Sequence, residues 1–224
     1  MRKRDAFKRL KKLRDDPVLF AEVVLGFKPF PYQQKLLQDE SKRIVACMGR
    51  QTGKTTVNAI KAVHFAYCNP KTLVLIVSPS LRQSIIMFDR ILDLIYSNPW
   101  LPKSVIRKTR TLIHLDNGSR IVALPCSANL LRGYTASLII ADECSFMPEE
   151  VITQVIFPML STTNGKAIFL STPWGRNHFF YRAFTDPNYS VHHVRSSDCL
   201  LIKKEFLEEQ RRNMTAETYR MEYE

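Results

Sequence analysis

The chain has 224 residues, of which 45% are apolar and 24% are charged, proportions that fit one globular domain with a buried core. Lysine and arginine outnumber aspartate and glutamate by 33 to 21, so the net charge of +12 favours a polyanion such as nucleic acid as a partner. No apolar run reaches the roughly 18 residues of a membrane helix and no CxxC pair occurs among the five cysteines, which argues against a membrane span, a disulfide framework and a zinc site.

A basic segment opens the chain. Residues 1–16 hold eight basic and three acidic side chains, with apolar residues at helical spacing among them. This pattern predicts an amphipathic basic helix, and Pro17 is expected to start a second one. We therefore divide the chain into a basic N-terminal helical segment, residues 1–26, and a main domain, residues 27–224.

Predicted strands and helices alternate through the main domain. The continuously apolar runs are typical of strands that a parallel sheet buries on both faces, and Asp116-Asn117-Gly118 joins two alternating runs into a predicted hairpin. We expect an α/β fold, a mainly parallel sheet flanked by helices with a small antiparallel hairpin insertion, and a functional site at the carboxyl ends of the strands. The predicted strands are RIVACM (43–48), TLVLIVSPS (72–80), two within TLIHLDNGSRIVALP (111–125), SLIIADE (137–143) and KAIFLSTP (166–173), and helices are expected to begin near Gln33, Lys54, Leu81 and Pro148.

The stretch GRQTGKTT, residues 49–56, follows the first strand and opens a helix, which is the context of a phosphate-binding loop. The usual first glycine of such a loop would stand at Met48, and the chain instead has its glycine one place later. Lys54 is expected to neutralise phosphate charge and the Thr55 hydroxyl to ligate Mg²⁺, while backbone N–H groups bind the β-phosphate. The predicted ATP-binding residues of this stretch are Gly49, Arg50, Gln51, Thr52, Gly53, Lys54, Thr55 and Thr56.

An acidic pair ends the strand SLIIADE. Asp142 is expected to hold the Mg²⁺ hydration shell, and Glu143 to orient or deprotonate the attacking water. The alternative is that the two carboxylates cap the helix expected near Pro148.

Two further stretches complete the predicted site. Ser171 and Thr172 end a neighbouring strand, where their hydroxyls could sense the γ-phosphate and pass its loss to the rest of the domain. Upstream, Gln33 has the donor and acceptor that the adenine edge needs, and Tyr32 or Phe30 could stack on the base. The alternative for Gln33 is an exposed residue at an ordinary helix N-terminus.

The stretches PYQ, GRQTGKT, LIIADE and STP, in this order and at these separations, resemble the ATPase domain of the large subunit of viral terminase, the motor that packages double-stranded DNA into phage capsids. The resemblance implies a P-loop NTPase fold of the RecA/ASCE type, ATP hydrolysis coupled to DNA translocation, and ATP and Mg²⁺ as cofactors. It implies as partners double-stranded DNA, a homo-oligomeric ring (a pentamer in this family), the portal protein and the small terminase subunit. The expected location is the cytoplasm of the infected host cell.

Two arginines gain roles from the resemblance. Terminases commonly carry an arginine and a glutamine before x-G-K-[ST], as Arg50 and Gln51 stand here, which implies that Arg50 reaches the phosphates and couples hydrolysis to movement. Arg132 precedes the acidic pair by the interval at which the family carries an arginine finger that acts across a subunit interface. The alternative is a surface arginine before the turn glycine Gly133.

A basic stretch precedes the predicted hairpin, and the family implies that it faces the pore of the ring. Its residues Lys103, Arg107, Lys108 and Arg110 are expected to contact DNA phosphates, and a solvated basic face is the competing interpretation. The N-terminal segment could equally touch DNA, the portal or a neighbouring subunit. No acidic cluster follows the ATPase motifs, so the nuclease domain of full-length terminases is expected to be absent from this chain.

Two other functions are alternatives. A superfamily 2 helicase-like protein shares the glutamine, acidic and Ser/Thr motifs but needs a second RecA-like domain, for which 224 residues leave no room. A nucleotide-regulated DNA-binding or assembly module would bind ATP with hydrolysis absent or incidental.

Overall fold

A computed structural model describes residues 3–224, and residues 1 and 2 of the predicted N-terminal segment lie outside the described residues. The fold is built on one eight-stranded sheet in the order β3-β4-β5-β2-β6-β7-β1-β8. The six strands from β5 to β8 in this order run parallel, whereas β3 and β4 pair antiparallel at one edge. The strands are β1 (Arg43–Met48), β2 (Leu73–Ser78), β3 (Val105–Lys108), β4 (Leu112–Leu115), β5 (Arg120–Pro125), β6 (Leu138–Asp142), β7 (Lys166–Ser171) and β8 (Ser190–Val194).

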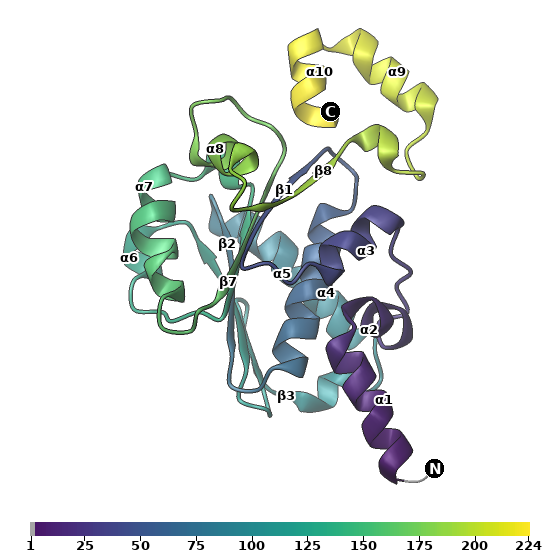
Figure 1. Ribbon diagram of the computed structural model, residues 1–224, viewed down its shortest axis with the longest axis vertical. Helices are drawn as coiled ribbons and strands as arrows, with labels where there is room; N and C mark the ends of the chain where they lie inside the picture. Colours follow the sequence, from purple (N-terminus) through teal and green to yellow (C-terminus); the bar gives the residue numbers. More distant parts are fainter. Residues whose placement is uncertain (1–2) are drawn as a thin grey trace.

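Helices cover both faces of the sheet, which Figure 1 shows nearly edge-on. One face carries a core formed with α2 to α5, and the other a core formed with α6, α7, α8 and the irregular helices after α7. This arrangement confirms the predicted α/β class. The helices are α1 (Lys3–Asp15), α2 (Pro17–Val23), α3 (Pro31–Gln38), α4 (Lys54–Cys68), α5 (Leu81–Tyr96), α6 (Ala128–Leu131), α7 (Glu149–Val151), α8 (Phe179–Thr185), α9 (Lys204–Asn213) and α10 (Ala216–Tyr223), with shorter helices η1 (Leu101–Ser104), η2 (Cys144–Phe146), η3 (Ile152–Ile156), η4 (Pro158–Leu160) and η5 (Ser196–Asp198).

The N-terminal helices follow the predicted break at Pro17. Asp16 caps α2 by accepting hydrogen bonds from Val18 N and Leu19 N at 2.9 and 3.0 Å. Helix α2 packs into the same hydrophobic core as α4, and the ring of Phe20 on α2 contacts the ring of His64 on α4. Within residues 3–224, none of the helices combines the length and the apolar character that crossing a bilayer requires.

Two segments differ from the sequence prediction. The helix expected from Pro148 continues only as α7, then widens into the π-helix η3 and tightens into the 3₁₀-helix η4, because Pro158 has no N–H to extend the regular ladder. The predicted two-stranded hairpin gains a third strand, because β3 pairs with β4 through Lys108 and Ile113. Arg107 and Lys108 of the basic stretch therefore lie on an edge strand, whereas Lys103 lies in η1 and Arg110 follows β3.

A buried lysine ties α4 to the end of α3. Lys61 is 6% exposed, and its ammonium donates to the carbonyl oxygens of Leu36, Leu37 and Asp39 at 2.8, 2.9 and 2.7 Å. The last carbonyl groups of a helix have no N–H partner within the helix, and the Lys61 ammonium supplies the missing donors. The helix before the phosphate-binding loop and the helix after it are thereby fixed to each other.

We expect Lys61→Met to lower the free energy of unfolding by about 2 kcal/mol, because it leaves buried carbonyls without a donor. Urea unfolding of the wild type and of the exposed control variant Lys35→Met measures the effect. Burial lowers the pKa of the Lys61 ammonium to about 8 from 10.5. Between these pH values the unfolded chain keeps the proton that the folded protein gives up, so the stability advantage of the wild type over Lys61→Met should grow as pH rises from 8 to 10.5. A stability difference between the wild type and Lys61→Met that did not change with pH would contradict the lowered pKa of Lys61.

Candidate nucleotide-binding site

The loop between β1 and α4 has the backbone of an anion-binding turn. Gln51 and Gly53 adopt left-handed conformations with φ of 61° and 78°, and the Thr52 hydroxyl donates to the Gly49 carbonyl at 2.8 Å. Helix α4 begins at Lys54, so the N–H groups of its first turn, including that of Thr55, have no partner within the helix. These groups and the helix dipole favour a phosphate at this position.

The displaced glycine has a structural cause. A Cβ on Gly49 would lie 2.5 Å from Ser196 Oγ and 3.0 Å from the Tyr223 carbonyl oxygen. The Gly49 N–H donates to the Val194 carbonyl oxygen at 2.9 Å, so the backbone of the C-terminal segment passes directly against Gly49. Gly49 is therefore required by close packing against η5 and α10. Sequence reasoning did not find this contact.

Lys54 and the acidic pair meet across the site, as the strand order places β6 near β1. Lys54 Nζ lies 2.9 Å from Glu143 Oε1, and the Glu143 N–H donates to Asp142 Oδ1 at 3.1 Å. Asp142 is 7% exposed, and burial together with the neighbouring charge of Glu143 raises its pKa to about 7. Glu143 has a left-handed φ of 54°, which turns the chain sharply after the strand.

The predicted coupling residues lie next to the acidic pair. Ser171 Oγ donates to Glu143 Oε2 at 3.4 Å and accepts from Ser145 N at the same distance. The Ser145 hydroxyl donates to the Thr172 carbonyl oxygen at 3.3 Å. Both predicted residues are buried, so this chain of contacts links the end of β7 to Glu143.

Gln33 and Tyr32 contact the loop itself. The Gln33 amide and the Tyr32 hydroxyl both donate to the Thr52 carbonyl oxygen, at 3.2 and 2.9 Å. Gln33 Oε1 also accepts from Phe30 N at 2.9 Å, and Tyr32 stacks on Phe30 with ring centroids 5.8 Å apart. These contacts tie the start of α3 to the phosphate-binding loop.

A cavity of about 420 Å³ lies beside the phosphate-binding loop and Glu143. Gln83 and Phe146 line it and were not predicted. Gln83 belongs to a capping box with Ser80 at the carboxyl end of β2, so the Ser-x-x-Gln pattern after a strand was a usable signal. Phe146 packs on Trp174 with ring centroids 4.9 Å apart, and no local pattern indicated it. The cavity is lined by Arg50, Gln51, Lys54, Gln83, Glu143, Phe146 and Thr172.

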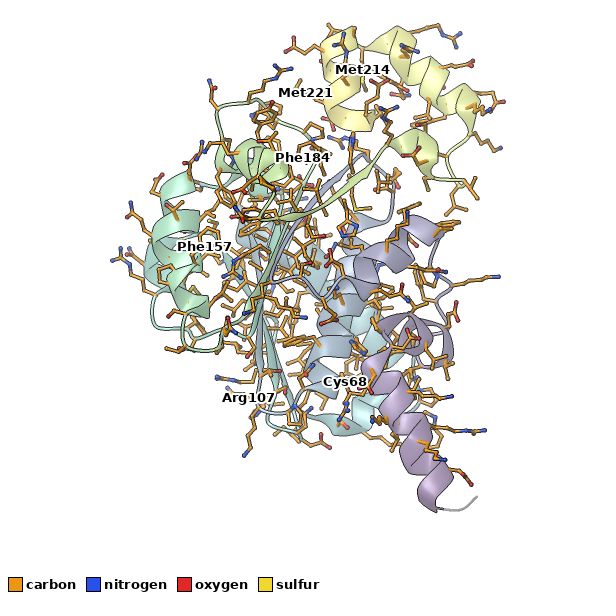
Figure 2. All side chains as sticks on the ribbon, in the orientation of Figure 1. Cys68, Arg107, Phe157, Phe184, Met214 and Met221 are labelled. Atoms are coloured by element: carbon orange, nitrogen blue, oxygen red, sulfur yellow. The ribbon has the colours of Figure 1, made fainter. Side chains whose placement is uncertain are left out.

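The predicted arginine finger and the predicted DNA-contact residues are not among the residues that line the cavity. Arg132 is exposed at the end of α6 and is not among the residues that line the cavity. Lys103, Arg107, Lys108 and Arg110 are all exposed on or beside the edge strand β3. Figure 2 places Arg107 at the same end of the molecule as Cys68, the last residue of α4, whereas the loop lies at the first residue of that helix.

The oxygen atoms present fit a Mg²⁺ ion. The Thr55 hydroxyl and the Asp142 carboxylate are hard oxygen donors, the class that Mg²⁺ prefers. Within residues 3–224, no group of three or more His, Cys, Asp or Glu side chains is arranged to hold a metal ion. A Mg²⁺ ion at this site would therefore depend on phosphate oxygens and water for its remaining ligands.

Comparison with known proteins assigns the chain to a family. It is 28% identical to the terminase large subunit of Thermus phage G20c over 96% of this chain and 51% of that protein, and 30% identical to that of Escherichia phage T5 over 84% and 44%. The chain thus spans about half the length of the curated relatives it matches. The structure resembles the large terminase ATPase domain of Thermus phage P74-26, with a TM-score of 0.83, 26% identity and coverage of 93% and 97%. Residues 45–223 match the family described as terminase large subunit, T4likevirus-type, N-terminal, and the chain therefore belongs to the terminase large subunit family.

Proposed function

We propose that this chain is the ATP-hydrolysing motor domain of a large terminase, which translocates double-stranded viral DNA into a procapsid. The observation that carries the proposal is the 2.9 Å approach of Lys54 and Glu143, which joins a phosphate-binding loop to the acidic end of a buried strand. The similar solved domain of phage P74-26 is an ATPase domain, and a solved large terminase of a thermophilic bacteriophage, at 18% identity a match in fold alone, is in complex with ADP. We assign residues 27–224 to the ATPase domain and residues 1–26 to a basic N-terminal segment.

The side chains divide the chemistry between them. Lys54 and the first N–H groups of α4 bind the phosphates, and Thr55 and Asp142 hold Mg²⁺, which when bound neutralises phosphate charge. Glu143 orients the attacking water and accepts its proton, because its carboxylate ends on the cavity that Lys54 faces. Ser171 contacts Glu143 and is placed to report the loss of the γ-phosphate.

The exposed Arg132 is assigned to a neighbouring subunit's site. Arg132 does not line the cavity of its own chain, which is expected of a guanidinium that completes a site across an interface. A ring, by family resemblance a pentamer, would supply that interface, with the portal protein and the small terminase subunit as further partners in the cytoplasm of the infected cell.

The proposal is tested by the ATPase rate per subunit, measured against protein concentration with and without double-stranded DNA. We expect a rate that rises with concentration and rises further with DNA. Absence of any heat on titration with MgATP would overturn the assignment of a nucleotide site.

The edge strand β3 is the proposed DNA contact. Two basic side chains here lie over exposed aromatic rings: Lys103, in η1 just before β3, has its Nζ 4.4 Å from the centroid of Trp100, and Lys108, on β3, has its Nζ 4.9 Å from that of Tyr96. These cation–π contacts hold the ammonium groups at the surface without neutralising their charge. The patch therefore presents positive charge that forms no salt bridge with a carboxylate among the described residues.

We expect the double variant Arg107→Ala/Lys108→Ala to weaken binding of double-stranded DNA equally for unrelated sequences. The slope of log affinity against log salt should fall by about 2, because each lost phosphate contact removes about 0.9. Fluorescence anisotropy at several salt concentrations measures the slope. The exposed pair Lys35→Ala/Arg212→Ala, on α3 and α9, is the matched control, and an equal fall in both variants would mean that only net charge matters.

A further inference from the structure

The turn between η5 and α9 exposes two adjacent leucines. Leu200 and Leu201 are 83% and 77% exposed, more than any other large apolar side chain among the described residues. They occupy the two central positions of a turn that is closed by a hydrogen bond of 3.0 Å from Ile202 N to the Cys199 carbonyl oxygen. Such positions favour glycine, proline, asparagine, aspartate and serine, so the turn itself gives no reason for leucine.

The residues on either side of the leucines are anchored. Cys199 is 2% exposed, and its Sγ lies 3.7 Å from the Gln51 carbonyl oxygen in the phosphate-binding loop. Ile202 packs against the small hydrophobic core of α9 and α10. The two leucines are therefore held outward at a fixed place, next to a loop residue that lines the nucleotide cavity.

An apolar pocket of about 310 Å³ lies between α8, β8 and α10. Phe180 and Phe184 of α8 line it. Trp174 and Tyr181 also line it, and these two side chains remain 50% and 36% exposed. A concave aromatic surface of this kind is where an apolar side chain of a partner gains most from burial.

The leucine turn and the aromatic pocket lie on opposite sides of α10. Figure 1 shows α8 on one side of α10 and the segment that enters α9 on the other. The leucines of one chain therefore do not reach the pocket of the same chain. Two different surfaces of one molecule that complement each other form a head-to-tail contact between copies, which closes into a ring when the rotation allows it.

The same contact agrees with the proposed role of Arg132. Helix α6, whose C-cap is Arg132, and helix α8 pack in the core on one face of the sheet. The leucine turn adjoins the nucleotide cavity through Cys199 and Gln51. A neighbour that receives Arg132 at its cavity would thus bring its leucines toward the face that carries the aromatic pocket.

Charged side chains that could pair stand at both surfaces. Arg195 and Arg220 line the pocket, and neither forms a salt bridge among the described residues. Helix α9, which follows the leucine turn, carries three exposed glutamates that form none either, Glu205, Glu208 and Glu209. Carboxylates beside the leucines are therefore available to the arginines of the pocket.

We propose that Leu200 and Leu201 dock into the aromatic pocket of a second copy of this chain and form the head-to-tail contact of the ring. This inference rests on the proposed function for the ring, and it adds an apolar contact that needs no nucleotide. Because burial of leucine supplies most of the attraction, salt should weaken this contact far less than it weakens DNA binding.

Disulfide formation between two variants tests the contact. Leu201→Cys and Arg220→Cys, mixed under mild oxidation with a mass tag on one of them, should give a covalent mixed dimer, because a disulfide needs Cβ atoms within about 4.5 Å. In the control mixture Arg90→Cys, an exposed position on α5 at the other face of the sheet, replaces Arg220→Cys and should give none. The native cysteines add little background, since four of the five are buried. No dimer in the first mixture, or equal amounts in both, would overturn the proposal.

Sedimentation velocity over a range of protein concentrations gives a second measurement. Leu200→Ser/Leu201→Ser should weaken self-association about 10- to 100-fold, since the pair loses its burial in the pocket. Leu10→Ser/Val23→Ser, at positions 65% and 66% exposed on α1 and α2, is the matched control and should associate as the wild type does. A wild type that stays monomeric at every concentration, or an equal loss in both variants, would contradict docking through these leucines.

Calorimetry with MgATP on the same proteins separates this inference from the function on which it rests. The leucine variant should bind MgATP as the wild type does, because neither leucine lines the nucleotide cavity. If the wild type binds no MgATP, the proposed ATPase function fails. The mixed-dimer result decides the docking contact in either case, so the two failures are distinguishable.

Discussion

Glu143→Gln is expected to lower the ATPase turnover by about 10²- to 10⁴-fold, because glutamine cannot accept the proton of the attacking water. The amide has nearly the same shape, so it should leave the phosphate-binding loop and the affinity for MgATP essentially intact. In the structure the Glu143 carboxylate contacts both Lys54 and Ser171, which fixes its orientation toward the cavity. Steady-state turnover and calorimetric titration of the same preparation measure the two effects separately.

The control for this prediction is Glu150→Gln, an exposed acidic residue on α7 that does not line the cavity. It should leave turnover unchanged. Loss of turnover with binding retained in Glu143→Gln supports an enzyme, whereas full function of this variant would favour a nucleotide-regulated DNA-binding module. Lys54→Ala should differ from both, since it removes the charge that binds phosphate and so reduces affinity as well as turnover.

Arg132→Ala is expected to lower turnover by about 10³- to 10⁵-fold under conditions in which wild-type subunits assemble and activate one another. The reason is geometric, since the Arg132 side chain is exposed and does not line the cavity of its own chain. Dilute, unassembled protein should show a low rate with or without the substitution. Arg90→Ala, an exposed arginine on α5, is the matched control and should behave as the wild type.

Mixing two inactive variants gives the sharpest test of this assignment. A subunit with Arg132→Ala keeps its own Lys54 and Glu143, and a Glu143→Gln neighbour can still supply Arg132, so the mixture should recover part of the activity that neither variant has alone. A mixture that stays inactive, or a wild-type rate per subunit that is flat with concentration, would remove Arg132 from the site.

Local sequence determined the framework of the site. The strands β1, β6 and β7 could be predicted because a parallel sheet buries both faces, so each reads as an uninterrupted apolar run. Because parallel strands end at one edge, the residues that follow them were expected to meet there. The contact between Lys54 and Glu143 and the one between Glu143 and Ser171 agree with that expectation.

The tertiary structure decided the features that depend on distant segments. Gly49 and Arg50 read as parts of a loop, yet their packing is set by Ser196, Tyr223 and Glu222, and the Arg50–Glu222 pair spans 172 positions of the chain. Gln33 was predicted to bind adenine, and the fold adds a contact that the sequence did not indicate, a hydrogen bond from its amide to the Thr52 carbonyl oxygen. The spacing of apolar residues along a helix or strand indicates which face is buried. It does not indicate which polar group from a distant part of the chain will contact that face. The sequence by itself therefore determined the sheet and the chemical groups along its carboxyl edge, whereas only the folded chain decided which of those groups line the cavity and which distant residues they contact.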